Sequence, residues 1–203
     1  FWRNRQMSIR RPAPDLIQPK TFKFSTINLI QIEKILKKYP HDKKSSAVLP
    51  LLDLAQRQND NWLPLAAIKI VANTLEMPMV KVLEVSTFYN MYNLSPVGKN
   101  LLQVCTTTPC WLRGSDEIYE ACKEKLGIDF GGTTKDKDFT LIEVECLGAC
   151  SNAPIVQIND DYYEDLDEIS ITSIIDKLKK NIQPQTGPQS ERTGSEPLNT
   201  KRR

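Results

Sequence analysis

The stretches LLQVCTTTPC, residues 101–110, and FTLIEVECLGAC, residues 139–150, both run from a short apolar strand pattern into a pair of cysteines. The two pairs have the spacings C-x4-C and C-x3-C and consist of Cys105, Cys110, Cys146 and Cys150. Close pairs of thiolates can approach a metal or an iron–sulfur cluster from two loops. Zinc knuckles and thioredoxin-type redox pairs favour C-x2-C, which neither pair has. The wider spacings favour two irons bridged by sulfide, with one pair on each iron.

The position of each pair at the end of a predicted strand would bring the four sulfurs together. Cys105 ends a strand over 101–105, and Cys146 ends a strand over 139–146. If these strands are neighbours, the loops that follow them meet at one end of the sheet. Gly148 lies inside the second pair, where a backbone with positive φ is easiest for glycine. Loop N–H groups directed at the sulfurs would stabilise the negative charge of a cluster.

The sequence that flanks the cysteines resembles that of a known protein family. It includes CTTTPC, ECLGACSNAPIVQIND, AVLPLLDLAQRQN at 47–59 and EVSTFYNMYNLSPVGK at 84–99. Together these stretches resemble the thioredoxin-like [2Fe–2S] ferredoxin family, and within it the members that serve respiratory NADH:ubiquinone oxidoreductase, complex I. The similarity runs from residue 22 to residue 182, and all four ligand positions of the family motif are present.

The resemblance implies a function as well as a fold. It implies a one-electron carrier in the NADH-oxidising module of mitochondrial complex I, with a [2Fe–2S] cluster held by the four cysteines. FMN and NADH would sit on a tightly associated partner subunit of about 51 kDa, beside other subunits of the peripheral arm. The chain would then be part of an NADH dehydrogenase on the matrix side of the inner membrane, with no complete active site of its own.

Two alternatives stay open. The same type of subunit serves in the diaphorase module of NAD-linked hydrogenases and formate dehydrogenases, although the Arg-rich N-terminus and the tail favour the mitochondrial version. Alternatively, the four thiolates could hold zinc in a module used only for assembly. A Rieske site needs two histidines, and the sequence has only His41.

No catalytic residues are expected on this chain. The sequence contains no G-x-G-x-x-G and no P-loop, so it offers no nucleotide or flavin motif. With a single histidine, it also shows no Ser/His/Asp or Cys/His constellation. The chain is therefore expected to carry electrons rather than to transform a substrate.

Charge and cysteine content narrow the class of protein further. Residues 21–182 carry 18 basic and 22 acidic side chains, whereas both ends are basic. A mildly acidic body argues against a nucleic-acid partner. No apolar run approaches the roughly 18 residues of a spanning helix, so the chain is expected to be soluble or peripheral through a partner. Five cysteines are too few, and odd in number, for a secreted disulfide framework, which favours a reducing compartment.

The N-terminal sequence FWRNRQMSIRRPAP is rich in arginine and has no acid before Asp15. It resembles a mitochondrial transit sequence or its mature remainder, and a basic arm is the alternative. The Phe at position 1 favours a processed N-terminus.

We expect an α+β chain with four parts: an extended arm over 1–20, a four-helix bundle over 21–98, a thioredoxin-like α/β domain over 99–182 that carries the cluster, and an extended tail over 183–203. The arm and the tail are too polar to fold alone. They are expected to have little regular structure and to be ordered mainly by partner chains.

Apolar residues at helical spacing predict the four N-terminal helices. The first ends before Pro40. The second is capped by Ser45 or Ser46, and the third starts near Pro64. The fourth spans 79–88 and buries Val82, Val85, and Phe88 or Tyr89.

The second domain is predicted as strand, helix, strand, hairpin and helix over 101–105, 115–126, 139–146, 155–163 and 169–178. Cys122 lies on the apolar face of the first of these helices and is expected to be a core thiol. The acidic stretch 160–168 does not match an EF-hand and is expected to be a solvated turn and helix start. The Ala153–Pro154 bond precedes a predicted strand beside the second cysteine pair, a place that a cis-proline commonly occupies in thioredoxin-like folds, so the resemblance implies a cis bond here.

Overall fold

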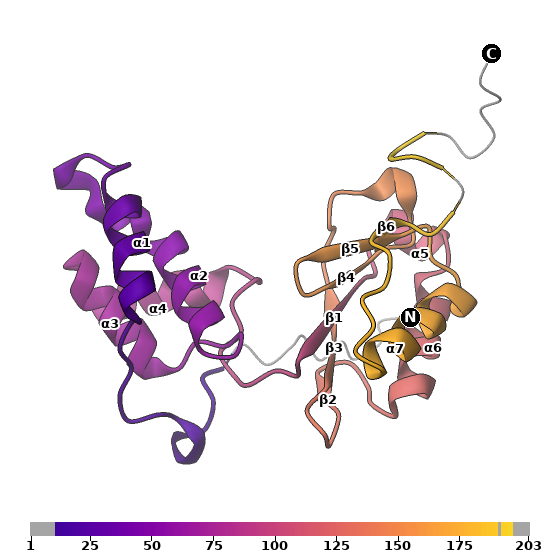
Figure 1. Ribbon diagram of the computed structural model, residues 1–203, viewed down its shortest axis with the longest axis horizontal. Helices are drawn as coiled ribbons and strands as arrows, with labels where there is room; N and C mark the ends of the chain where they lie inside the picture. The colour runs from indigo at the N-terminus through magenta and orange to yellow at the C-terminus, as the bar shows by residue number, and fades with distance from the viewer. Residues whose placement is uncertain (1–10, 191, 197–203) are drawn as a thin grey trace. The chain divides into compact units, whose positions relative to one another are not determined.

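The computed structural model describes residues 11–190 and 192–196, which form two compact units (Figure 1). One unit lies within Ile9–Val97 and is helical, whereas the other begins at Gly98 and is built on a β-sheet. Over the described residues, no helix combines the length and the apolar character needed to cross a membrane.

The first unit contains the four expected α-helices. They are preceded or joined by two 3-10 helices, η1 (Asp15–Ile17) and η2 (His41–Ala47), and their bounds are α1 (Thr26–Leu36), α2 (Val48–Gln58), α3 (Leu65–Leu75) and α4 (Met79–Phe88). Ser25 begins α1, because its hydroxyl accepts the amide of Asn28. The apolar stripes of α2, α3 and α4 meet in one core around the fully buried Leu52, Ile68 and Val82.

Two details of the helical prediction are wrong. Ser45 and Ser46 do not cap α2, because η2 runs directly into it and places Ala47 at the N-cap. Phe88 is 73% exposed and Tyr89 is 40% exposed. The helix ends at Phe88, and the small Ser86 occupies the buried position one turn after Val82.

The described part of the N-terminal arm packs on the helical unit. Ala13 is buried and donates its amide to the carbonyl of Leu94 at 2.9 Å, and the side chain of Gln18 accepts the amide of Leu65 at 3.0 Å. The described part of the arm therefore has polar partners within its own chain, and its ordering mainly by partner chains stays a prediction. The predicted arm also includes residues 1–10, which lie outside the described residues.

The second unit has a mixed sheet of six strands over the described residues, in the order β2-β3-β1-β4-β5-β6. The strands are β1 (Asn100–Cys105), β2 (Gly132–Thr133), β3 (Phe139–Val144), β4 (Val156–Ile158), β5 (Asp161–Glu164) and β6 (Gly187–Pro188). β1 pairs in parallel with β3 and antiparallel with β4, and β4 and β5 form the predicted hairpin. The predicted order of elements is confirmed; β2, β6 and the short α5 (Thr108–Leu112) are additional.

Two helices lie side by side on one side of this sheet, namely α6 (Ser115–Leu126) and α7 (Glu168–Lys179) (Figure 1). Their apolar faces bury Ile118, Cys122 and Ile171 against strand residues such as Leu102 and Leu141. Gly127, with φ of 67°, ends α6, and a capping box between Asp167 and Ser170 begins α7.

The predicted tail is also partly folded onto its own domain. β6 extends the sheet beside β5, and the amide of Gln189 donates to the carbonyl of Glu164 at 2.9 Å. Residues 187–190 and 192–196 therefore find backbone and charged partners within the same unit, and ordering of the tail mainly by partner chains stays a prediction. Residue 191 and residues 197–203 lie outside the described residues.

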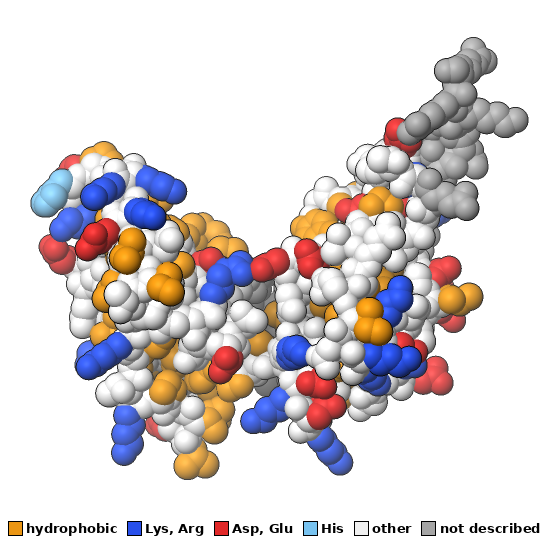
Figure 2. All heavy atoms as spheres, in the orientation of Figure 1, with side chains coloured by type: hydrophobic (Ala, Val, Ile, Leu, Met, Phe, Trp, Pro, Cys, Tyr) orange, Lys and Arg blue, Asp and Glu red, His pale blue; other side chains and the backbone are white. Residues whose placement is uncertain are grey.

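Charges of both signs are interspersed over the face of the molecule drawn in Figure 2. Exposed ion pairs of the described residues include Arg57 with Asp53 on α2 and Lys81 with Glu84 on α4. Exposed pairs of this kind contribute little to stability, so the fold depends on its two apolar cores.

Replacing Leu141 tests the core of the second unit. Leu141→Ala should lower the free energy of unfolding by about 2–5 kcal/mol, because Leu141 is fully buried between β2 and β1. Urea unfolding followed by circular dichroism measures this loss. Ile169→Ala is the matched control: its side chain is 81% exposed on α7, and the change should stay within about 0.5 kcal/mol. Equal losses for both variants would contradict the assigned core.

Candidate metal centre

The parallel pairing of β1 and β3 brings both cysteine pairs to the same end of the sheet. Cys105 is the last residue of β1 and lies opposite Val144, the last residue of β3. Cys110 follows in α5, and Cys146 and Cys150 follow in the loop after β3. The expectation that the two strands are neighbours is confirmed.

The first pair is fully buried. Interaction between the two thiols lowers the pKa of Cys105 to about 5 and raises that of Cys110. The hydroxyl of Thr107 lies 3.3 Å from the sulfur of Cys105. The structure therefore already favours a thiolate at Cys105, the form in which cysteine binds metals.

The second pair is exposed. The sulfurs of Cys146 and Cys150 lie 3.4 Å apart. The amide of Gly148 donates to Cys146 Sγ at 3.4 Å and lowers the pKa of Cys146, whereas the hydrogen bond with Cys146 raises the pKa of Cys150. Gly148 has φ of 81°, as predicted for a residue inside this pair.

Packing brings the loop of the second pair against the first pair. Leu147 and Ala149, which lie between Cys146 and Cys150, pack against the buried cluster that contains Cys105 and Cys110. The phenol of Tyr162 holds this loop by donating to the carbonyl of Leu147 at 2.8 Å. Apolar side chains surround the buried pair, among them Ile155.

The donor set fits a binuclear cluster. The four thiols lie in two pairs at one end of the sheet, and the amide of Gly148 points at the sulfur of Cys146. Within residues 11–190 and 192–196, no three His, Cys, Asp or Glu side chains converge closely enough to hold one metal ion. A [2Fe–2S] cluster needs only two thiolates on each iron, which is the arrangement of these pairs.

Comparison with known proteins identifies the family. Residues 32–179 match the thioredoxin-like [2Fe–2S] ferredoxin family. The chain belongs to this family. The E subunit of NADH-quinone oxidoreductase from Rickettsia bellii is 64% identical over 160 residues, which are 79% of this chain and 96% of that relative. The mitochondrial NADH dehydrogenase [ubiquinone] flavoprotein 2 of Dictyostelium discoideum is 51% identical over 175 residues, 86% of this chain and 71% of that relative.

A solved structure shares the fold. The air-oxidized NAD+-reducing [NiFe]-hydrogenase matches with a TM-score of 0.59 at 18% identity, over 71% of this chain. The present chain spans about a quarter of the length of that hydrogenase chain. At this level of identity, the likeness concerns the fold alone.

The remaining predictions for this ferredoxin domain have mixed outcomes. The Ala153–Pro154 bond is cis, and Cys122 is a fully buried core thiol, as predicted. His41 is exposed at the start of η2, in the helical unit, as predicted for a loop residue between helices. Asp165 contradicts the prediction that 160–168 is solvated: its side chain is only 5% exposed, because Arg192 covers it.

Sequence reasoning also missed several residues that support the site. Thr107, Tyr162 and Asn152 contact the cysteine loops through side chains that no metal-ligand spacing identifies. Of these three residues, only Thr107 could have been suggested by the sequence, because it lies between the two cysteines of the C-x4-C pair. The contacts of Tyr162 and Asn152 exist only in the tertiary fold, so no local sequence pattern indicates them.

Cys122 provides an internal test of the site. Its side chain is fully buried in the apolar core of the second unit, and this burial raises its pKa to about 12. It belongs to a different buried cluster from Cys105 and Cys110. Cys122→Ser should leave iron content unchanged while lowering the free energy of unfolding by about 1–3 kcal/mol, because the serine hydroxyl is buried without a hydrogen-bond partner. Iron analysis and urea unfolding measure the two effects. A loss of iron from this variant would show that Cys122 belongs to the site.

Proposed function

We propose that this chain is a one-electron carrier in the NADH-oxidising module of complex I, corresponding to the 24 kDa subunit of the mitochondrial enzyme. The observation that carries the proposal is the meeting of two cysteine pairs at the ends of β1 and β3. The 64% identity to the Rickettsia bellii relative, over 96% of that relative's length, supports it.

Cys105, Cys110, Cys146 and Cys150 are the proposed ligands of a [2Fe–2S] cluster. The bound cluster supplies reversible one-electron oxidation and reduction. The chain's own residues hold it and set its surroundings: the amide of Gly148 points at the sulfur of Cys146 and favours negative charge there. Because Cys146 and Cys150 are exposed, their side of the site is where an electron donor or acceptor can approach.

The proposed partner carries FMN and NADH, and further subunits of the peripheral arm complete the module. The names of the relatives and the absence of a nucleotide motif from the sequence support a division of labour between chains. We place the chain on the matrix side of the inner membrane, supported by the mitochondrial relative and the Arg-rich N-terminal sequence. In this proposal, residues 99–182 carry the cluster and residues 21–98 form the helical domain.

A diaphorase module of an NAD-linked hydrogenase is the second candidate, favoured by the fold shared with the hydrogenase structure. It uses the same ligands and the same one-electron chemistry. Purification of the native complex separates the two, because a hydrogenase would bring nickel with it. A four-thiolate zinc module would give a colourless chain.

Ligand substitution tests the proposed set. The purified chain should show iron–sulfur absorption in the visible range and, after reduction with dithionite, a rhombic EPR signal. Serine at any of the four proposed ligands should abolish or alter both spectra, because thiolate is the preferred ligand. Cys122→Ser is the matched control and should keep both. Bleaching by Cys122→Ser together with an unaltered Cys150→Ser variant would overturn the ligand set.

The division of labour makes a second prediction. NADH should not reduce the cluster of the isolated chain, because the chain has no nucleotide motif, whereas dithionite should. Addition of the flavin-bearing subunit should make NADH effective. EPR after NADH addition, with and without that subunit, measures this. Reduction of the isolated chain by NADH alone would contradict a pure carrier role.

A further inference from the structure

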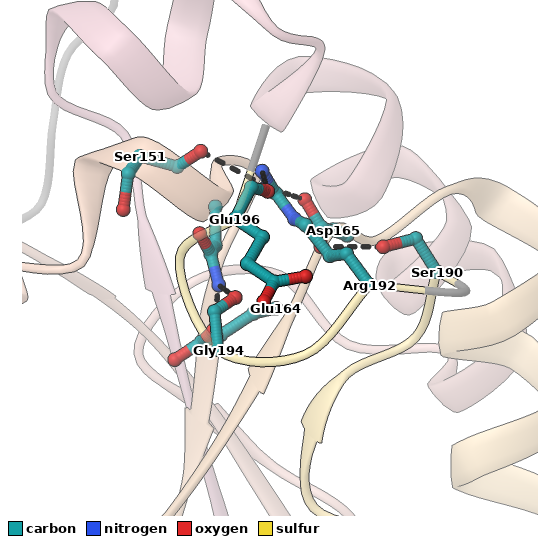
Figure 3. Close-up of polar contacts among 8 residues, drawn as sticks. Ser151, Glu164, Asp165, Ser190, Arg192, Gly194 and Glu196 are labelled. Atoms are coloured by element: carbon teal, nitrogen blue, oxygen red, sulfur yellow. Dashed lines mark hydrogen bonds and ion pairs between the residues drawn. The ribbon is translucent and has the colours of Figure 1, made fainter. Parts of the chain in front are cut away.

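The tail crosses the loop that carries Cys150. After β6, it reaches the residues that directly follow this cysteine, where Figure 3 shows Arg192 and Gly194 beside Ser151 and the end of β5. The contacts join segments about forty residues apart in sequence, since Arg192 reaches Ser151 and Gly194 reaches Asn152. We call residues 187–190 and 192–196 the strap.

Arg192 is the centre of these contacts. Its guanidinium donates hydrogen bonds to both carboxylate oxygens of Asp165: Nε lies 2.6 Å from Oδ2, and Nη2 donates to Oδ1. The two side chains are only 8% and 5% exposed, so the pair is buried. Ser190 donates to the same carboxylate at 2.8 Å. A buried, bidentate ion pair of this kind fixes the orientation of the guanidinium as well as its distance from the carboxylate.

The same guanidinium holds the cysteine loop. Nη2 of Arg192 also donates to the carbonyl of Ser151 at 3.0 Å, and Nη1 donates to the carbonyl of Glu196 at 3.0 Å. Arg192 therefore connects the end of β5, the strap itself and the residue next to Cys150. No other cation among the described residues reaches the carbonyl of Ser151.

Asn152 provides a second, independent connection. Its side-chain amide donates to the carbonyl of Gly194 at 2.8 Å and to the carboxylate of Glu164, and its own backbone carbonyl accepts the amide of Asp165 at 2.7 Å. Both residues after Cys150 are thus held by the strap and by the end of β5. Cys150 itself is exposed and lies at the start of η3 (Cys150–Asn152), a single short turn.

We propose that Arg192 is a positioning residue for the cluster: through Ser151 and Asp165 it holds the Cys150 loop in the geometry that ligation requires. The proposal rests on the proposed function, in which Cys150 is a ligand. The other pair differs, because Cys105 and Cys110 are fixed by burial in the core. The strap therefore acts on the exposed half of the ligand set.

The test uses three variants of the full-length chain. Arg192→Ala removes the clamp, and Arg192→Lys keeps a positive charge beside Asp165 but cannot bond to Asp165 and Ser151 with one planar fork. Thr193→Ala is the matched control, because the exposed side chain of Thr193 lies in the same strap. Iron release to a chelator, followed by loss of visible absorption, should be about 10–100-fold faster in Arg192→Ala and intermediate in Arg192→Lys. Thr193→Ala should match the wild type.

Two readouts separate positioning from a general loss of stability. In Arg192→Lys, the rhombic EPR signal of the reduced protein should shift while far-ultraviolet circular dichroism remains that of the wild type. In the cluster-free chain, hydrogen exchange should accelerate at the amides of residues 150–152 and stay unchanged in β1. Equal acceleration in β1 would mean that the strap only stabilises the domain, and would overturn the proposal.

The outcomes also separate this proposal from the proposed function. A wild-type chain that takes up no cluster would overturn the proposed function and the positioning role with it. A wild-type chain that holds the cluster, with wild-type release rates and EPR signals in both Arg192 variants, would overturn only the positioning role. If Arg192→Ala does not fold, Arg192→Lys decides.

Discussion

The site depends on the parallel pairing of β1 with β3. In a parallel pair the carboxyl ends of both strands lie at the same edge, so the loops after Cys105 and after Val144 emerge together. The helix α6 makes the crossover between the two strands, and its apolar face closes the core beneath them. An antiparallel pair would place the two cysteine loops at opposite ends of the sheet, with no common site.

The ligand set is built asymmetrically on this frame. Cys105 and Cys110 are packed in apolar surroundings, whereas Cys146 and Cys150 face solvent on a loop. A buried pair gives rigidity and excludes water, and an exposed pair gives access to a redox partner. Exposure of the second pair leaves its loop outside the packed core. Hydrogen bonds of the Tyr162, Asn152 and Arg192 side chains hold this loop instead.

Local patterns predicted the main elements of the fold well. The helical spacing in 115–126 reflects one buried face of α6, which is a property of the segment itself. The apolar run in 139–146 was enough to predict a strand, although residues 139–142 of β3 are all buried and both faces of the strand are covered. The cysteine pairs could be recognised because their spacing is likewise a property of the local sequence. The short α5 was not predicted, because Pro109 at its start and the threonines before it look like a loop. Phe88 was misplaced because the helical repeat was extended to the last residue of α4.

The contacts of the strap could not be predicted from such patterns. Arg192 and Asp165 stand 27 positions apart in polar segments, and charged side chains in polar segments are usually solvated. Only the tertiary fold places one against the other and removes water from both. The ligands of the site could therefore be listed from the sequence, while much of what holds the exposed pair in place could not.

The buried pair between Asp165 and Arg192 also sets an order of events during synthesis. The ribosome adds the four cysteines and Asp165 before it adds Arg192. The carboxylate of Asp165 therefore lacks its guanidinium partner until residue 192 has been made and has emerged. Until then the loop around Cys150 lacks the contacts of Arg192 and Gly194. Completion of this half of the site is thus a late step, one that the nascent chain cannot reach while residue 192 is still inside the exit tunnel.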